Sequence, residues 1–425
     1  MNNVVVTDIA PGVRFSEVRD SRFKTMRISA TALVPLENST VAQYALLSQV
    51  LTRSCREYPD FTELSRKLSS LYGASLEAGV RKLGETLGLT FSVSGIDDRY
   101  ALDGESICAE LSELLCSVLF EPKLVDGNFD NDEIEQERRQ LIDLSDSEIN
   151  DKRAYSNKRL LEFMCEGEAY GIRRYGSAEQ IRAVTAEELK TAWTTLLKDA
   201  KFEIIYVGDT APVTAKRVFS EKFSSVERTP AELNTFVVRK AGEVRSFTDT
   251  MEVAQAKLLM GFRTDCATPD EDVTAMRLMC AILGGGANSK FFKNVREKQS
   301  LCYYCFSRFH RVKGILTVES GVEADNVEKA KNAILTELQA MQNGDITEDE
   351  INFAKLSVAN DFVSICDNVS GIQEWYLSQL CDGRFLTVKE ASDEFAAITK
   401  DEIVKAAQKL TLDTVYVLKG KEEDV

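Results

Sequence analysis

The side chains best suited to chemistry in this sequence are few. There is one histidine, His310, and one close pair of cysteines, in the run Cys302-Tyr303-Tyr304-Cys305. Two thiols at this spacing are typical of redox sites and of half of a four-cysteine zinc site, but no second Cys-x-x-Cys completes the zinc set. The alternative is a β-strand, which the aromatic neighbours favour. Residues three apart on a strand point to opposite faces, so on that interpretation the thiols diverge.

His310 could serve as the base for a cysteine nucleophile such as Cys305. Five residues apart on a strand, these two side chains would also point to opposite faces. A single histidine excludes a two-histidine zinc site and any relay of several imidazoles.

Two other stretches have a chemical and a structural interpretation. The run Gly284-Gly285-Gly286 could cradle a phosphate, but it lacks the P-loop ending and the GxGxxG spacing. We expect a turn in which the glycines permit positive φ. The acidic stretch 126–151 could bind a cation or a basic peptide, although most such runs are solvated helix faces.

The composition excludes several classes of protein. Of 425 residues, 52 are Lys or Arg and 68 are Asp or Glu, for a net charge of −16, which disfavours binding to nucleic acid. At 44% hydrophobic residues the chain is an ordinary globular protein. It has no signal-like N-terminus and no apolar run that approaches a membrane span. Ten scattered cysteines suggest a reducing compartment, so a cytoplasmic protein is expected.

The elements that must position these residues follow from periodicity and capping. Period-two alternation predicts strands at 25–34 and 87–94, and N-cap chemistry at 38–40 predicts a helix over 41–51. Further helices are predicted over 106–119, from 132 onward and over 189–197, and further strands over 201–208 and 414–418. Strands mixed with helices predict an α+β fold.

The chain also repeats itself. Three features recur in the same order: the capping boxes Thr185/Glu188 and Thr399/Glu402, the triplets 132–134 and 349–351, and the pairs Arg66/Leu71 and Arg296/Leu301. A repeat of this length indicates a duplicated domain. We therefore predict homologous α/β domains at 1–225 and 247–425, joined by a linker at 226–246.

The run from Leu283 to Tyr303 resembles the C-terminal domain of the M16 metallopeptidases, the group of insulin-degrading enzyme (insulinase), pitrilysin and the processing peptidases. Their pattern is a glycine-rich turn, a helix with Arg-Glu-Lys, and Leu-x-Tyr. The resemblance covers about residues 20–415. It implies two domains of the LuxS and processing-peptidase type that form half of a clamshell. It also implies that Arg296 and Tyr303, which have the family's spacing, bind the peptide substrate.

The same resemblance places the family's zinc motif, His-x-x-Glu-His, in the first half. Leu51 to Pro59 lines up with the residues that follow the motif, and counting back puts Ala45, Ser48 and Gln49 at the ligand and base positions. None of the three can replace them, since alanine has no donor, serine is a poor base and a neutral amide is a weak zinc ligand. Glu135 or Glu137 falls near the third ligand, but one carboxylate alone binds zinc weakly. The resemblance thus implies no catalytic residue, no metal and no cofactor in this chain.

What the resemblance implies is the non-catalytic subunit of a bacterial two-subunit M16 peptidase that processes or degrades peptides. A partner subunit would carry His-x-x-Glu-His and the zinc, and this chain would be inactive alone. The isolated chain could form a homodimer. The alternative is a peptide-binding or scaffold protein with no associated proteolysis, and a third hypothesis is an autonomous peptidase with a different site.

Overall fold

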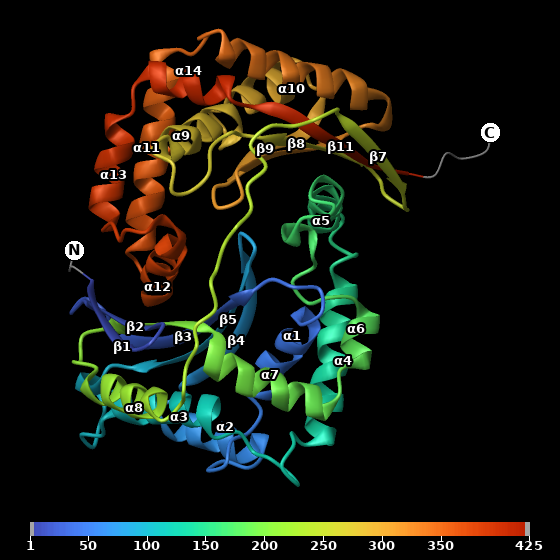
Figure 1. The fold of residues 1–425 in the computed structure, drawn as a ribbon. Helices are drawn as coiled ribbons and strands as arrows, with labels where there is room; N and C mark the ends of the chain where they lie inside the picture. Colours follow the sequence, from blue (N-terminus) through green and yellow to red (C-terminus); the bar gives the residue numbers. More distant parts are fainter. Residues whose placement is uncertain (1–3, 421–425) are drawn as a thin grey trace. The chain divides into compact units, whose positions relative to one another are not determined.

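Two β-sheets lie at the centres of two separate packing units in the computed structural model, which describes residues 4–420 (Figure 1). The first unit comprises residues up to 146 together with 172–234 and 364–380. The second comprises 147–171, 235–363 and the residues from 381 onward. The two units share one sheet topology but exchange segments.

The first unit has a mixed sheet of six strands. In spatial order the strands are β1 (Val5–Ala10), β2 (Val13–Arg19), β6 (Lys201–Gly208), β3 (Thr25–Pro35), β5 (Thr86–Ile96) and β4 (Ser75–Leu83). Only β2 and β6 pair in parallel. The helices of this unit are α1 (Val41–Val50), α2 (Phe61–Ser70), α3 (Ile107–Phe120), α4 (Asn131–Ser147), α6 (Ala178–Ala183), α7 (Ala186–Asp199), α8 (Val213–Ser224) and α12 (Val369–Ser378).

The two faces of this sheet differ in character. One face carries Phe15, Ile28, Ile204 and similar side chains, and packs with α1, α3, α7 and α8 into a single apolar core. The alternation of the strands places polar residues on the other face, and α12 lies across β3 and β6 there. Arg27 on β3 donates a 2.6 Å hydrogen bond to the buried Gln373 of α12.

The second unit has a sheet of five strands. In spatial order they are β7 (Arg245–Thr250), β11 (Thr411–Lys419), β8 (Ala256–Arg263), β10 (Ile315–Val322) and β9 (Cys302–His310). Only β7 and β11 are parallel. Its helices are α5 (Lys152–Met164), α9 (Val273–Gly284), a π-helix (Phe291–Lys298), α10 (Val327–Gln342), α11 (Glu348–Ile365), α13 (Val388–Ala397) and α14 (Lys400–Gln408).

The order β7-β11-β8-β10-β9 repeats the order β2-β6-β3-β5-β4, including the single parallel pair. The predicted capping boxes both form, Thr185 with Glu188 at the start of α7 and Thr399 with Glu402 at the start of α14. The triplets 132–134 and 349–351 begin the equivalent helices α4 and α11. The α+β fold with two homologous halves is therefore confirmed.

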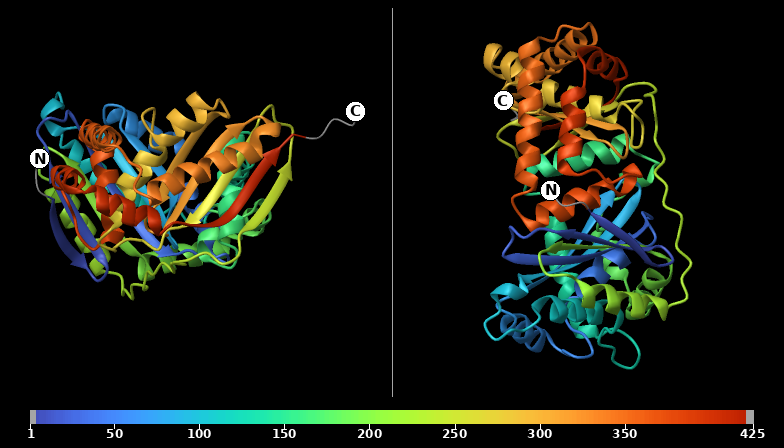
Figure 2. Two further views of the ribbon diagram at one scale, coloured as in Figure 1. Left: turned by 90° about the horizontal axis from the view of Figure 1, so that it is seen from above. Right: turned by 90° about the vertical axis from the view of Figure 1, so that its left-hand side faces the viewer.

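Each half of the chain donates a helix to the other unit, which the sequence analysis did not predict. Helix α5, drawn in green in Figure 1, packs on β8 and β11 of the second unit, and α12 packs on β3 and β6 of the first. The two helices occupy equivalent places in the repeat. Between α8 and β7 the chain runs without helix or strand, as Figure 2 shows.

Two local expectations are wrong. Thr40 precedes α1 but makes no capping hydrogen bond with its side chain. The glycines 284–286 do not adopt positive φ. Gly284 instead lets α9 approach β9 closely, because a Cβ there would lie 2.5 Å from the backbone nitrogen of Ser307.

Candidate functional site

The backbone that carries Arg296 and Tyr303 departs from regular helix and strand geometry in several places. Residues 291–298 form a π-helix, a rare conformation that occurs often at functional sites. Ser300, in the turn that follows, has φ of 52°, which is unusual for a residue other than glycine. Irregular backbone of this kind persists only where the surrounding structure enforces it, and it concentrates at binding and catalytic sites.

Tyr303 is the extra residue of a β-bulge on the edge strand β9. Cys302 pairs with Val322 and Tyr304 pairs with Gly321, so Tyr303 has no partner of its own on β10. A bulge re-aims a side chain and is common beside active sites. The side chain of Tyr303 accordingly points to solvent, with 51% of its surface exposed.

The polar groups of both residues are presented at the surface of the second unit. Arg296 is exposed, its guanidinium carbon lies 4.5 Å from the centre of the Phe292 ring, and it forms no salt bridge within residues 4–420. The hydroxyl of Tyr303 donates a hydrogen bond to Glu323, and this bond raises the pKa of the phenol. The guanidinium can therefore donate to a ligand directly, whereas the Tyr303 hydroxyl would have to exchange Glu323 for the ligand as its acceptor.

The bulge also overturns the expectation that the two thiols of Cys302-x-x-Cys305 diverge. Cys305 pairs with Ser320 and Cys302 with Val322, and these two partners lie two residues apart on β10. Paired residues of antiparallel strands point to the same face, so both thiols lie on one face of the sheet. Both are buried there.

His310 has a structural role. Its Nδ1 lies 3.2 Å from the hydroxyl of Tyr170 and its Nε2 lies 3.3 Å from the hydroxyl of Thr317. With no bulge between 305 and 310, its side chain faces away from Cys305, as expected. Tyr170 belongs to the exchanged segment 147–171, so the one imidazole of the chain helps to hold that segment in the second unit.

The predicted degenerate positions Ala45, Ser48 and Gln49 lie on α1 in the first unit. Ala45 and Ser48 are fully buried. The Ser48 hydroxyl donates to the carbonyl of Ala45 at 2.8 Å, and the Gln49 amide donates to Ser48 at 3.2 Å. Helix α1 therefore satisfies its polar side chains internally and offers no zinc donor set.

Of the two candidates for a third ligand, Glu137 is the buried one and Glu135 is exposed. Arg53, four residues beyond Gln49, places its guanidinium 3.2 Å from the carboxylate of Glu137. Glu135 instead bonds Arg138 on the surface of α4 at 2.9 Å. Burial raises the pKa of Glu137, while Arg53 opposes the shift. The sequence analysis missed Arg53, although its helical spacing from Gln49 was visible.

The residues present at α1 and α4 do not fit the zinc ion that the resemblance implies for the catalytic members. Among residues 4–420, the one group of His, Cys, Asp or Glu side chains close enough to share a metal is Cys266, Asp270 and Asp272, in the second unit. There Arg239 pairs with Asp270 and Lys409 with Asp272, and burial keeps the pKa of the Cys266 thiol high.

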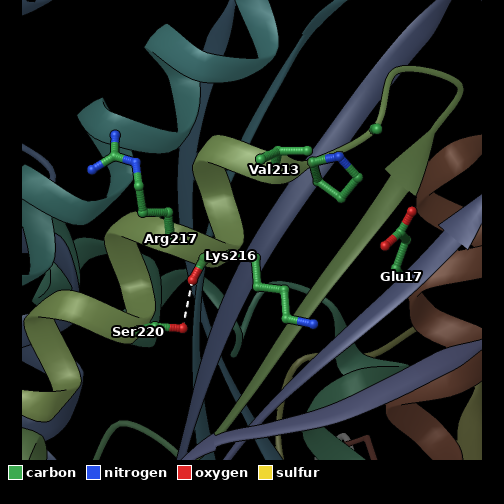
Figure 3. Close-up of a pocket in the computed structure, with 7 residues that line it drawn as sticks. Glu17, Val213, Lys216, Arg217 and Ser220 are labelled. Atoms are coloured by element: carbon green, nitrogen blue, oxygen red, sulfur yellow. Dashed lines mark hydrogen bonds between the residues drawn. The ribbon is translucent and has the colours of Figure 1, made fainter.

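A shallow depression of about 340 Å³ lies beside α8 in the first unit (Figure 3). Its two cations already have partners. Lys216 donates to Thr7 at 3.1 Å, and Arg217 pairs with Glu221 at 3.0 Å. Glu17, which also lines the depression, lies 3.9 Å from Arg19, so each of its charged groups has a partner within the chain.

The comparisons with known proteins agree with this description. The family model described as "Peptidase M16 inactive domain" matches residues 183–358. The chain is 31% identical over 405 residues to the "Probable inactive metalloprotease YmfF" of Bacillus subtilis, with 95% of each chain covered. A crystal structure of a conserved protein from Enterococcus faecalis superposes with a TM-score of 0.90 at 27% identity, over 100% of both chains. A peptidase M16 inactive domain from Pseudomonas fluorescens shares the fold, with a TM-score of 0.80 at 18% identity over 98% of both chains.

One further finding concerns membranes. In the part of the chain that the structure describes, every helix is too short or too polar to cross a bilayer.

Proposed function

This chain belongs to the M16 peptidase family as an inactive member, and from that premise we propose that it is the non-catalytic, substrate-binding subunit of a two-chain zinc peptidase. A partner of the same family would carry His-x-x-Glu-His and hold the zinc. The two chains would close around a peptide, which the assembled enzyme processes or degrades.

The observation that carries the proposal is the contrast between two regions of one chain. At α1 and α4 the donors needed for zinc are absent, and Arg53 engages the buried Glu137. At the edge of the second sheet, a π-helix and a β-bulge present Arg296 and Tyr303 to solvent. Irregular backbone that exposes an arginine and a tyrosine is typical of functional sites, and this supports the proposal.

The chemistry available to these residues is hydrogen bonding and charge stabilisation. A guanidinium and a phenol can both donate to a peptide carbonyl. They can donate more strongly to the negative charge that develops on that oxygen when water attacks, which is the state whose stabilisation accelerates the reaction. Activation of the water would belong to the partner's zinc.

The substrate would bind in an extended conformation along a sheet edge. Each sheet ends in an edge strand, β4 in the first unit and β9 in the second. An added strand is held mainly by backbone hydrogen bonds, so recognition of side chains would be broad. Ten scattered cysteines suit a reducing cytoplasm, where we propose that the complex works.

The test requires the partner, which a pull-down with this chain identifies. The assembled pair is then assayed for peptide cleavage with Arg296→Ala or Tyr303→Phe in this chain. Loss of one donor to the reacting oxygen is expected to lower kcat/KM by about 100-fold or more. Lys298→Ala, on the same π-helix, and Tyr100→Phe, an exposed tyrosine of the first unit, are the matched controls.

Unchanged kcat/KM in both variants would reject substrate contact by this pair. A chain that binds peptides but is recovered only with proteins lacking His-x-x-Glu-His would favour the scaffold hypothesis instead. Zinc that stays with the purified chain, with cleavage blocked by a chelator, would contradict the proposal in favour of an autonomous peptidase.

A further inference from the structure

The cysteines on either side of the bulge lie on the same face of the sheet, with their thiols in hydrogen-bonding contact. Their partners Ser320 and Val322 are two residues apart on a regular strand, a spacing of about 6.6 Å between Cα atoms. Disulfides span Cα separations of about 4.4–6.8 Å. The cysteines lie opposite residues at this separation, and the Cys305 thiol hydrogen-bonds Cys302, so the pair is placed for a disulfide to form.

The surroundings of the pair favour reaction at Cys302. A hydrogen bond from Cys305, and then the polar contact with Ser320 and the positive charge of Arg296, lower the pKa of the Cys302 thiol to about 7, against the opposing effect of burial. The pKa of Cys305 is raised, mainly by burial. Cys302 is also the more exposed of the two, with 9% of its surface accessible against 2% for Cys305. Cys302 is therefore the thiol that deprotonates more readily, and it lies beside a resolving thiol that stays protonated.

We propose that Cys302 and Cys305 are a redox modification site that forms a reversible disulfide on exposure to hydrogen peroxide. The proposal does not depend on the peptidase partner, because it concerns thiols of this chain alone. The disulfide would close a loop that contains Tyr303, one of the two residues proposed to contact the substrate.

The reaction balances in two steps. The Cys302 thiolate attacks one peroxide oxygen, so that an S–O bond forms, the O–O bond breaks, and the departing hydroxide becomes water with the proton that the thiol released. Cys305 then attacks the sulfenic sulfur, so that the S–S bond forms, the S–O bond breaks, and the proton of Cys305 leaves in a second water. Two thiols lose two electrons to one peroxide, and a dithiol reductant reverses the change.

The experiment uses the full reduced chain, treated with a small molar excess of hydrogen peroxide. Thiol titration under denaturing conditions is expected to fall from ten free thiols, the number in the sequence, to eight. Peptide mapping by mass spectrometry is expected to show a 302–305 disulfide, with the loss of two hydrogen atoms and recovery on reduction. Ten thiols remaining, a disulfide elsewhere, or oxygen added to Cys302 without a disulfide would each overturn the proposal, and none of these results depends on a variant folding.

Variants and a pH profile then assign the roles. Cys302→Ser and Cys305→Ser are expected to abolish disulfide formation, whereas Cys381→Ser, which removes the least buried of the other cysteines, leaves it intact. Alkylation of Cys302 by iodoacetamide is expected to rise with pH around a midpoint near 7, and Arg296→Gln moves that midpoint upward. A midpoint that stays above 9 in the unmodified chain would contradict the assignment of Cys302 as the attacking thiol.

Discussion

Arg53 shows how a single side chain stabilises a site that has lost its metal donors. Glu137 is buried, and an unpaired carboxylate in that position would be costly. The guanidinium supplies the compensating charge and also contacts Gln136 through a 2.7 Å hydrogen bond. Arg53, in the first turn after α1, thereby links that turn to α4 by direct side-chain contacts, without a metal ion. The buried carboxylate is thus part of the structure of the inactive domain and is not available to a metal.

A second buried carboxylate, Glu203 on β6, makes the stability of the chain depend on pH. Burial raises its pKa from 4.5 to about 7, although Arg14 bonds one of its oxygens at 2.5 Å. Burial outweighs the pairing because the Arg14 side chain is 35% exposed, so water screens its charge, and Oε2 of Glu203 has no hydrogen-bond partner. Between these pH values the folded chain binds the proton more tightly than the unfolded chain does.

The contribution of Glu203 to the free energy of unfolding is therefore expected to fall, by roughly 3 kcal/mol at most, as the pH rises from about 4.5 to about 7. Above that range it levels off. Urea unfolding at several pH values measures this slope, and Glu203→Gln is expected to reduce it, the remainder coming from the buried Glu137, whose pKa is also raised. Glu77→Gln, at an exposed position on β4, is the control that should leave the slope in place. An identical slope with and without Glu203 would rule out this carboxylate as its source.

Among the elements, α5 and the residues after it depend on a buried group of ions. Glu168 pairs with Arg263 of β8 and with Lys313, both at 2.6 Å, and Lys313 is fully buried. Arg263 also bonds Asp413 of β11 at 2.9 Å. The network fastens the exchanged segment 147–171 to the second sheet.

Removing Glu168 leaves two buried cations with reduced compensation, so Glu168→Gln is expected to destabilise the chain by about 3–5 kcal/mol. Urea unfolding near pH 7 measures the loss. Glu166→Gln is the matched control, since its side chain is 77% exposed and its ion pair with Arg245 is 3.5 Å long; a change within about 0.5 kcal/mol is expected there. Equal effects of the two substitutions would contradict the role given to the network.

The elements that could be predicted from sequence are those with a strong local pattern. Alternation predicted β3 and β5, and Thr-x-x-Glu predicted the starts of α7 and α14, because these patterns act over a few neighbouring residues. The bulge at Tyr303 could not be predicted in this way, since an extra residue on one strand is defined only by the strand that it pairs with. The same limit explains the wrong inference that the thiols diverge. The residues Arg296 and Tyr303 came from a resemblance between motifs, and their role in substrate binding stays a prediction.

For the whole molecule, the exchange of α5 and α12 makes the two repeats depend on each other. A duplicated chain would be expected to fold as two independent halves joined by a linker. Here the first unit is completed by residues 364–380, which come from the second half of the chain and include α12. The second unit is completed by residues 147–171, which come from the first half and include Glu168. If either half folded alone, one face of its sheet would lack the helix that covers it, α12 on the first sheet or α5 on the second.

We therefore expect the fragments 1–234 and 235–425, expressed separately, to be unfolded or aggregated. The first fragment loses α12, which buries Trp375, Tyr376 and Leu377. The second loses Glu168 and with it a carboxylate that pairs with the buried Lys313, a defect of the kind that costs about 3–5 kcal/mol, comparable to the net stability of a domain. Expressed together, the fragments are expected to associate and to show one cooperative thermal transition.

The control is the full chain, folded first and then cut by a protease at a site introduced into 231–235. In that protein the exchanged segments 147–171 and 364–380 are already in place. A fragment that unfolds cooperatively by itself, with the native melting temperature, would show that the exchange is not required for folding.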